Sequence, residues 1–279
     1  MAFLRPHWSY SALNQYLRCP LQYYFERVLK LPKATLGSGA ALGSAVHAAL
    51  ADYHQRLRDE LPTTKPAMQL AFLAAWENCE ARQSIVFKAG QNRDQQIEVG
   101  LALLELYRQQ PPPQGIMAIE QAVWSPLVTS RGEILEKPLV AILDLAVEED
   151  GELLIREFKT SGRAYGMTEV ENSLQATCYV NAAWHEWDRW ARVEFAILVK
   201  TKQPKFQTVP TSRMEEDLHR VGDLAEAVDR AVFQKHFYPV ETPLNCSGCP
   251  FRSPCREWRG PLPVTLDLPR YATNGSAAC

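Results

Sequence analysis

Two carboxylates and a lysine in the middle of this 279-residue chain have the types and spacing of a metal site. The segment GELLIREFKTS predicts a β-strand, along which side chains alternate, so Glu157 and Lys159 point to one face. The DG pair at 150–151 is typical of a two-residue hairpin turn, and counting back through it places Asp144 opposite Glu157. Two like charges about 5 Å apart destabilise a sheet unless they are compensated. We therefore predict a bound divalent cation, Mg²⁺ or Mn²⁺, because oxygen ligands suit both ions.

The surroundings of Asp144 favour the same interpretation. VAIL precedes this residue and LAV follows it, so an unpaired charge there would be costly. Lys159 is placed to orient or help deprotonate an attacking water and to stabilise charge that develops on a phosphate. The alternative is a surface hairpin with solvated charges, since short charged strand motifs such as EFK are common.

Clustered cysteines indicate a second metal site. Cys246, Cys249 and Cys255 lie in a short Pro/Gly-rich segment, where tight turns let several sulfurs converge. The chain has seven cysteines and no export signal, so metal ligation is a better interpretation than disulfides. Cys19 is the best candidate for a fourth ligand, because it lies between two predicted helices and before a proline. The remaining cysteines fall inside predicted helices or in the tail: Cys79, Cys178 and Cys279.

Helices are expected on the N-terminal side of these residues. Apolar residues at helical spacing predict two short helices that meet at Cys19. The Gly/Ser segment GSGAALGS leads into a helix with His47 near its start. Two further helices are predicted at about 66–82 and 92–109, before PPPQG ends the helical region.

Strands follow the helices. Three are predicted in IMAIEQAVWSPL, KPLVAILDLAVEE and GELLIREFKTS. After them we expect a helix at about 168–188, the strand RVEFAILVKT, a short strand near FQTVP, and a helix from about Met214 to Lys235. The predicted class is therefore α/β, with a core order of helix, three strands, helix and strand.

Composition limits the class of protein. The hydrophobic and charged fractions, 46% and 22%, are those of an ordinary folded globular protein. The net charge of −2 argues against a DNA coat protein but allows an enzyme with a local basic track. The sequence has no apolar run of about eighteen residues and no secretory layout at its start, so we expect a cytoplasmic protein without a membrane segment.

In this order the motifs resemble one family. HxAL at His47, LD at Asp144, EFKTS and QATCY are similar to the motifs of the PD-(D/E)XK nuclease superfamily, in its RecB-like branch, which has a restriction-endonuclease-like core. The resemblance implies that His47, Asp144, Glu157 and the carbonyl of Phe158 hold the metal, and that Lys159 assists the water. One departure is that AIL precedes the aspartate, where the family often has Gly-Arg or Gly-Lys.

Other positions depend more heavily on the resemblance. Gln175 and Tyr179 share a helix face and match the family's Q-x-x-x-Y motif, although such a pair is more often simple packing. A lone histidine in a helix usually has a structural role. Because the family places a metal-binding histidine in this helix, His47 is preferred to His54 as the candidate metal ligand. Glu120 resembles an acidic position that is often present on this strand, with a solvated strand edge as the alternative.

The cysteines also carry a resemblance. RCPLQYYF and CSGCPFRSPC are similar to the arrangement in the AddB C-terminal nuclease and in CRISPR-adaptation nucleases. This implies a 4Fe-4S cluster on Cys19, Cys246, Cys249 and Cys255, with structural Zn²⁺ as the alternative, since four thiolates serve both. Iron-sulfur is favoured because zinc sites usually draw ligands locally in pairs. The cluster would staple the two ends of the chain together.

We expect a metal-dependent nuclease that hydrolyses DNA phosphodiester bonds. The expected mode is exonuclease action on single-stranded DNA or DNA ends in repair, recombination or CRISPR adaptation, with proteins of such a complex as partners. Aromatic side chains are predicted to stack on bases and basic side chains to meet phosphates: Tyr23, Tyr24 and Tyr179, and Lys200, Lys202 and Lys205. For Tyr23 and Tyr24 the alternative is packing in the core.

Two rival functions stay open. The first is a non-catalytic iron-sulfur subunit that binds DNA or assists assembly, against which the complete Asp, Glu and Lys set argues. The second is a zinc-stabilised interaction module with an incidental hairpin.

The predicted organisation is a single RecB-like nuclease domain at 1–259, followed by an irregular tail at 260–279. The domain is composed of N-terminal helices at 1–36, a core at 37–236 with a helical insertion at 62–112, and a cysteine segment at 237–259.

Overall fold

The computed structural model describes residues 6–33 and 35–260. The predicted tail, from residue 261 onward, and Cys279 lie outside the described residues. Contacts between residues divide the chain into two compact units. We call residues 35–125 and 140–218 the sheet unit, and residues 1–34, 126–139 and 219–279 the terminal unit.

A five-stranded sheet forms the centre of the sheet unit, in the order β3-β4-β5-β6-β7. The strands are β3 (Ile116–Ser125), β4 (Leu139–Glu149), β5 (Glu152–Ser161), β6 (Ala191–Val199) and β7 (Lys205–Thr211). β5 and β6 are parallel, whereas β4 with β5 and β6 with β7 are antiparallel. A parallel pair needs a crossover connection, which α6 (Met167–Glu171) and α7 (Leu174–Trp187) provide.

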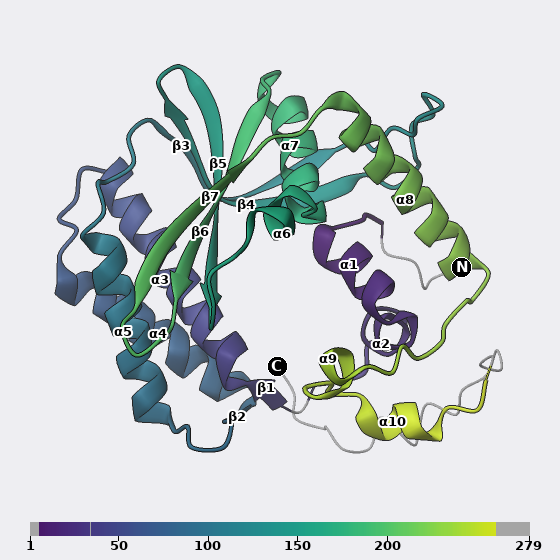
Figure 1. The fold of residues 1–279 in the computed structure, drawn as a ribbon, viewed down its shortest axis with the longest axis horizontal. Coiled ribbons are helices and arrows are strands. Elements are labelled where there is room, and N and C mark those ends of the chain that lie inside the picture. The colour runs from purple at the N-terminus through teal and green to yellow at the C-terminus, as the bar shows by residue number, and fades with distance from the viewer. Residues whose placement is uncertain (1–5, 34, 261–279) are drawn as a thin grey trace. The chain divides into compact units, whose positions relative to one another are not determined.

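Helices cover both faces of this sheet (Figure 1). On one face lie α3 (Ser38–Arg58), α4 (Lys65–Arg82) and α5 (Arg93–Arg108), which share a core with β4, β5 and β6. α7 packs on the other face, where its alanines and Val180 meet Ile155 and Val193. A small parallel sheet joins β1 (Thr35–Gly37) to β2 (Ser84–Val86). The mixed α/β class and the predicted core order are confirmed.

The central hairpin forms as its turn predicts. Asp150 and Gly151 have φ angles of 54° and 79°, the positive values that a two-residue turn of this kind requires. Glu149 pairs with Glu152, and the pairing continues along both strands to Leu145 and Arg156. The carboxylates at positions 144 and 157 follow directly after this last pair.

Two element boundaries differ from the prediction. The Gly/Ser segment lies inside α3, because burial of the alanines beside its glycines against the sheet outweighs their low helix propensity. The helix predicted at 168–188 is two helices, with a break at Asn172 and Ser173. Ser173 caps α7 by accepting from the N–H of Ala176, and Arg213 binds the carbonyls at the break.

The terminal unit brings the N-terminal helices to the cysteine segment. It contains α1 (Tyr10–Arg18), α2 (Pro20–Tyr23), the π-helix η1 (Tyr24–Val28), most of α8 (Glu215–Phe233), α9 (Pro243–Cys246) and α10 (Arg252–Glu257). Cys19 stands between α1 and α2, as predicted, with Pro20 at the first helical position. The Tyr16 hydroxyl donates to the carbonyl of His236 at 2.7 Å, and the Phe25 and Phe251 rings lie 5.9 Å apart. None of the helices in the described part of the chain is long and apolar enough to cross a membrane.

Candidate metal centre and active site

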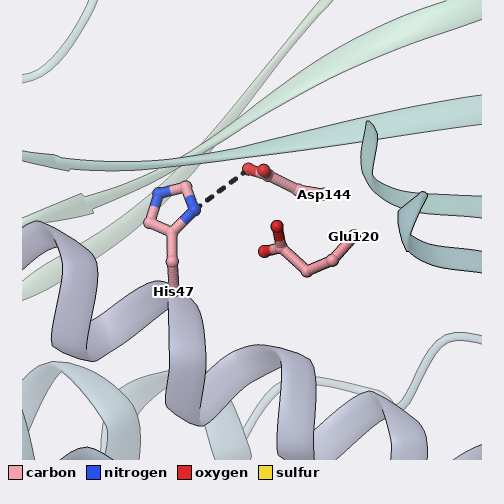
Figure 2. Close-up of side chains that lie close together, drawn as sticks. All are labelled: His47, Glu120 and Asp144. Carbon is pink, nitrogen blue, oxygen red and sulfur yellow. Dashed lines mark ion pairs between the residues drawn. The ribbon is translucent and has the colours of Figure 1, made fainter. Parts of the chain in front are cut away.

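Three side chains from separate elements converge in the sheet unit (Figure 2). His47 comes from α3, Glu120 from β3 and Asp144 from β4, and one ligand atom of each lies within 4.8 Å of the others. His47 Nδ1 is 3.4 Å from Asp144 Oδ2. One imidazole and two carboxylates form a donor set that suits a divalent cation.

Irregular backbone brings the two carboxylates into this group. Glu120 has a φ of 47°, a left-handed conformation that a residue inside a regular strand does not adopt. In a regular strand Leu143 and Leu145 would point to the same face of the sheet. In β4 they do not: Leu143 packs into the core under α7 and Leu145 into the core under α3, so the alternation of side chains is interrupted at Asp144. Irregularities of this kind redirect side chains and are frequent beside active sites.

Asp144 also ties β4 to β5. It is 8% exposed, and its Oδ2 accepts a hydrogen bond from the N–H of Phe158 at 2.9 Å. The Phe158 side chain lies in the core, stacked on His54 with 5.4 Å between the ring centroids. The predicted role of the Phe158 carbonyl as a metal ligand stays a prediction.

Glu157 lies in an adjoining hydrogen-bond network. Its carboxylate is 2% exposed, and Oε1 accepts from Lys159 Nζ at 2.6 Å and from Gln175 Nε2 at 2.8 Å. Oε2 accepts from the Tyr179 hydroxyl at 2.5 Å. Lys159 Nζ also donates to Gln175 Oε1 at 2.9 Å. The structure therefore brings together the predicted residues of β5 and α7, but Glu157 faces this network and does not belong to the group within 4.8 Å.

Negative charge accumulates where the two groups adjoin. Glu120 is exposed as a residue, but partial burial of its carboxyl group and the charges of Asp144 and Glu157, against the opposing effect of His47, raise its pKa to about 7. Burial and the charge of Asp144 likewise raise the pKa of Glu157, against the opposing effect of Lys159. Burial alone would lower the pKa of His47, but its hydrogen bond to Asp144 and the nearby carboxylates raise it. Burial opposes ionisation of Asp144, yet His47 and the Phe158 N–H keep its pKa below the ordinary value. A bound cation would relieve the remaining repulsion.

Glu120 is the residue that sequence reasoning did not include in the metal site. The signal was present, because IMAIEQAV sets a charged residue inside an apolar strand, as the segment around Asp144 does. His54, the second histidine of α3, lies outside the group of His47, Glu120 and Asp144. It is fully buried, its Nε2 lies 2.8 Å from the Tyr107 hydroxyl, and burial lowers its pKa to about 3.

The predicted base-stacking role is wrong for two of the three tyrosines. Tyr23 and Tyr179 are 3% and 4% exposed, so their rings offer no face to a base. Tyr24 is half-buried, and its ring centroid lies 4.6 Å from that of Phe237. Lys202 and Lys205 are exposed, and Lys200 is half-buried with Lys88 nearby, so their phosphate contacts stay a prediction.

The four predicted cluster ligands line one cavity of about 380 Å³ in the terminal unit: Cys19, Cys246, Cys249 and Cys255. Cys19 Sγ accepts from the N–H of Val240 at 3.5 Å. Burial raises the pKa of the Cys249 and Cys255 thiols, and the proximity of the other cysteines raises it further. Cys79 and Cys178 lie in α4 and α7, which belong to the sheet unit.

Comparisons with known proteins bear on the family and the fold. A family model described as the PD-(D/E)XK nuclease superfamily matches residues 7–256. A crystal structure of a "putative exonuclease" from Eubacterium rectale is similar with a TM-score of 0.58 and 11% identity, and the match covers 96% of this chain and 94% of that one. At this identity the likeness shows the fold alone. A second solved structure, SSO0001, has a TM-score of 0.35 and 12% identity over 86% of this chain and 92% of that one, and it carries no argument. No curated protein matches the chain.

Proposed function

This chain belongs to the PD-(D/E)XK nuclease superfamily, and from that premise we propose that it is a divalent-metal-dependent deoxyribonuclease that hydrolyses phosphodiester bonds in the cytoplasm. The observation that carries the proposal is the convergence of His47, Glu120 and Asp144 beside the network of Glu157, Lys159 and Gln175. A purely structural charge cluster would have no need of a histidine and two carboxylates within 4.8 Å of one another.

His47, Glu120 and Asp144 would hold the ion, and Glu157 and the Phe158 carbonyl are proposed to add ligands on the β5 side. When bound, Mg²⁺ or Mn²⁺ supplies Lewis-acid activation of water and phosphate. Lys159 is held by its bonds to both Glu157 and Gln175, so its ammonium group has a fixed direction for donating to a phosphate oxygen.

The remaining residues of the network, Gln175 and Tyr179, hold Glu157 and Lys159 in place. Gln175 bridges Glu157 and Lys159, and the Tyr179 hydroxyl fixes the second oxygen of Glu157. We assign Tyr179 this positioning role in place of the base stacking predicted from the sequence.

The mode of action is proposed to be that of an exonuclease on single-stranded DNA or DNA ends, in repair, recombination or CRISPR adaptation with partner proteins. The similar structure described as a "putative exonuclease" supports this choice. The alternative is a non-catalytic iron-sulfur subunit. It is disfavoured because the set of Asp144, Glu157 and Lys159 is complete: Lys159 bonds to Glu157, and the carboxylates of Glu157 and Asp144 lie close enough to shift each other's pKa.

We further propose that residues 1–259 form one RecB-like nuclease domain, with 62–112 as a helical insertion.

For the cysteine cavity we propose a 4Fe-4S cluster, with structural Zn²⁺ as the alternative. All four candidate ligands, Cys19, Cys246, Cys249 and Cys255, line one cavity of about 380 Å³. Iron-sulfur is favoured because Cys19 lies more than two hundred residues from the other three cysteines, whereas zinc sites usually draw their ligands locally in pairs.

The nuclease proposal is tested with end-labelled linear DNA and circular DNA, incubated with Mg²⁺ or Mn²⁺. We expect the wild-type protein to degrade linear DNA only when metal is present and to leave circular DNA intact. Asp144→Ala should lose both metal binding and cleavage. Lys159→Ala should bind Mn²⁺ normally by calorimetry but cleave at least about a hundredfold more slowly. Wild-type turnover by either variant would contradict the assignment.

A further inference from the structure

Arg213 is a buried cation that has no place in the metal centre. It follows the edge strand β7, belongs to the sheet unit and is 6% exposed. Burial lowers the pKa of this guanidinium, against the opposing charge of Asp217. Burying an arginine side chain is costly unless its donors are well satisfied. The positions of its hydrogen-bond acceptors therefore indicate what it does.

The acceptors lie on both sides of Gln175 in the sequence. Arg213 Nη2 donates to the carbonyl oxygens of Val170 and Ser173, at 3.1 and 2.9 Å. Nε donates to Thr177 Oγ1 at 2.8 Å. Val170 belongs to α6, Ser173 is the N-cap of α7, and Thr177 is in its first turn. One side chain thus joins the two helices across the break and fixes the backbone before and after Gln175.

The other end of the guanidinium is anchored to the strand. Nη1 donates to Thr211 Oγ1 and to the carbonyl of Ser212, both at 2.6 Å. β7 makes a second contact of this kind, because the Gln207 side chain accepts from the N–H of Tyr165 at 2.9 Å and donates to its carbonyl at 3.0 Å. The edge strand therefore holds the connection from β5 to α7 at two places.

The position of Gln175 matters because this residue touches both charged groups of the network. Its amide donates to Glu157 and accepts from Lys159, over 2.8 and 2.9 Å. A shift of the first turn of α7 would lengthen both bonds together. Without Arg213, each of the two carbonyls at the helix break would lose one donor and would keep only local bonds, which include those from the N–H groups of Ser173 and Thr177, at 3.1 and 3.4 Å. The first turn of α7 would then lose its link to β7 and could move relative to Glu157 and Lys159.

We propose that Arg213 is a positioning residue, which locks the junction of α6 and α7 and so keeps Gln175 aligned with Glu157 and Lys159. This inference rests on the proposed nuclease function. The hydrogen bonds of Arg213 go to residues other than the proposed metal ligands, and its side chain is buried, so its loss should lower turnover and leave binding unchanged.

The test compares Arg213→Lys and Arg213→Met with the wild-type protein. Lysine keeps the charge, but one ammonium group cannot span the acceptors that the planar guanidinium joins. We expect kcat on end-labelled DNA to fall roughly 10- to 100-fold, with unchanged KM and unchanged half-saturating Mn²⁺ concentration. In a Gln175→Ala background, Arg213→Met should cause almost no further loss, because the two residues act as a unit. Full additivity would overturn the inference.

Asn181→Ala is the matched control for general destabilisation. Asn181 lies in the same helix and donates to Ser125 Oγ at 2.8 Å, so its replacement also removes a buried hydrogen bond. This variant should melt at a lower temperature but retain the wild-type kcat. Amide hydrogen exchange at 170–179 should accelerate in Arg213→Lys and stay unchanged in Asn181→Ala.

The outcomes separate the inference from the function on which it rests. A wild-type protein without metal-dependent cleavage contradicts the nuclease proposal. An active wild-type protein whose Arg213→Lys variant keeps its kcat overturns the positioning role. Unchanged exchange at 170–179 in Arg213→Lys also overturns it, and this measurement decides the question even if Arg213→Met does not fold.

Discussion

At the scale of single residues, the metal centre and the adjoining network together contain two basic and three acidic side chains. His47 and Lys159 each contact one carboxylate, at Asp144 and Glu157, whereas Glu120 has no such partner among the described ion pairs. The consequence is visible in the pKa of Glu120, which rises from 4.5 to about 7. In the metal-free protein this carboxylate therefore keeps its proton up to near neutral pH.

This shift predicts how the stability of the metal-free protein depends on pH. The folded state holds the Glu120 proton more tightly than the unfolded state, so stability is lost as pH rises from about 4.5 to about 7. Glu120→Gln removes that loss. In EDTA, the variant and the wild-type protein should melt alike at pH 5, and the variant should melt higher at pH 8. The difference is expected to be on the order of a few degrees, since Glu120 is partly screened by solvent.

Added metal provides the complementary measurement. At pH 8, Mn²⁺ should raise the melting temperature of the wild-type protein much more than that of Glu120→Gln, because binding stabilises the folded state by mass action. A wild-type protein that melts higher than the variant at pH 8 without metal would show that Glu120 is not destabilised by its neighbours.

At the scale of elements, close packing of α3, α4 and α5 on one face of the sheet positions α3, the helix from which His47 reaches the site. Gly100 of α5 lies where these helices meet. A Cβ atom at this position would lie 2.3 Å from Phe72 Cζ and 3.0 Å from Leu42 Cδ1. Phe72 is fully buried, so its ring has little room to move away.

Gly100→Ala should therefore destabilise the protein, despite the better helix propensity of alanine. We expect a loss of about 1–3 kcal/mol in the free energy of unfolding, from overpacking. Gly43→Ala in α3 is the matched control, because its Cβ would lie at an ordinary 3.5 Å from Thr160 Oγ1. That variant should be neutral or more stable by up to about 1 kcal/mol. Chemical denaturation of both variants checks the opposite signs, and equal effects would contradict the packing argument.

At the scale of the whole molecule, the terminal unit is assembled from three separate stretches of the chain. Its two ends meet at the cysteine cavity, where Asn245 Nδ2 also donates to the carbonyl of Arg18 at 2.8 Å. Joining residues so far apart in sequence restricts the unfolded chain strongly. A cluster on these cysteines would thus be a major source of stability for this unit.

The cluster is tested by Cys19→Ser beside Cys79→Ser. Anaerobically purified wild-type protein should be brown, with about four irons per chain. Cys19→Ser should lose iron and unfold more readily, by roughly several kcal/mol, with any loss of activity a consequence of instability. Cys79→Ser should keep both iron and stability, since Cys79 belongs to α4 of the sheet unit and does not line the cavity. Colourless protein that carries one zinc would decide for the zinc alternative.

Sequence alone determined the features that depend on neighbouring residues. The hairpin turn at Asp150 and Gly151 follows from backbone preferences, and the register of the hairpin follows from that turn. Alternation along β5 placed Glu157 and Lys159 together, and helical spacing placed Gln175 with Tyr179. The helices of the insertion, α4 and α5, were also predictable, since long periodic patterns carry a strong local signal.

Tertiary structure decided the features that break those local rules. The left-handed backbone at Glu120 and the change of alternation at Asp144 bring these carboxylates to His47 instead of leaving Asp144 simply opposite Glu157. Burial decided that Tyr23 packs in the core, and the long-range contacts of Arg213 decided that one predicted helix is two. Local sequence patterns cannot show such features. A one-residue irregularity in a strand turns a side chain to the other face of the sheet, and the backbone strain of that irregularity is offset only by contacts with distant parts of the chain.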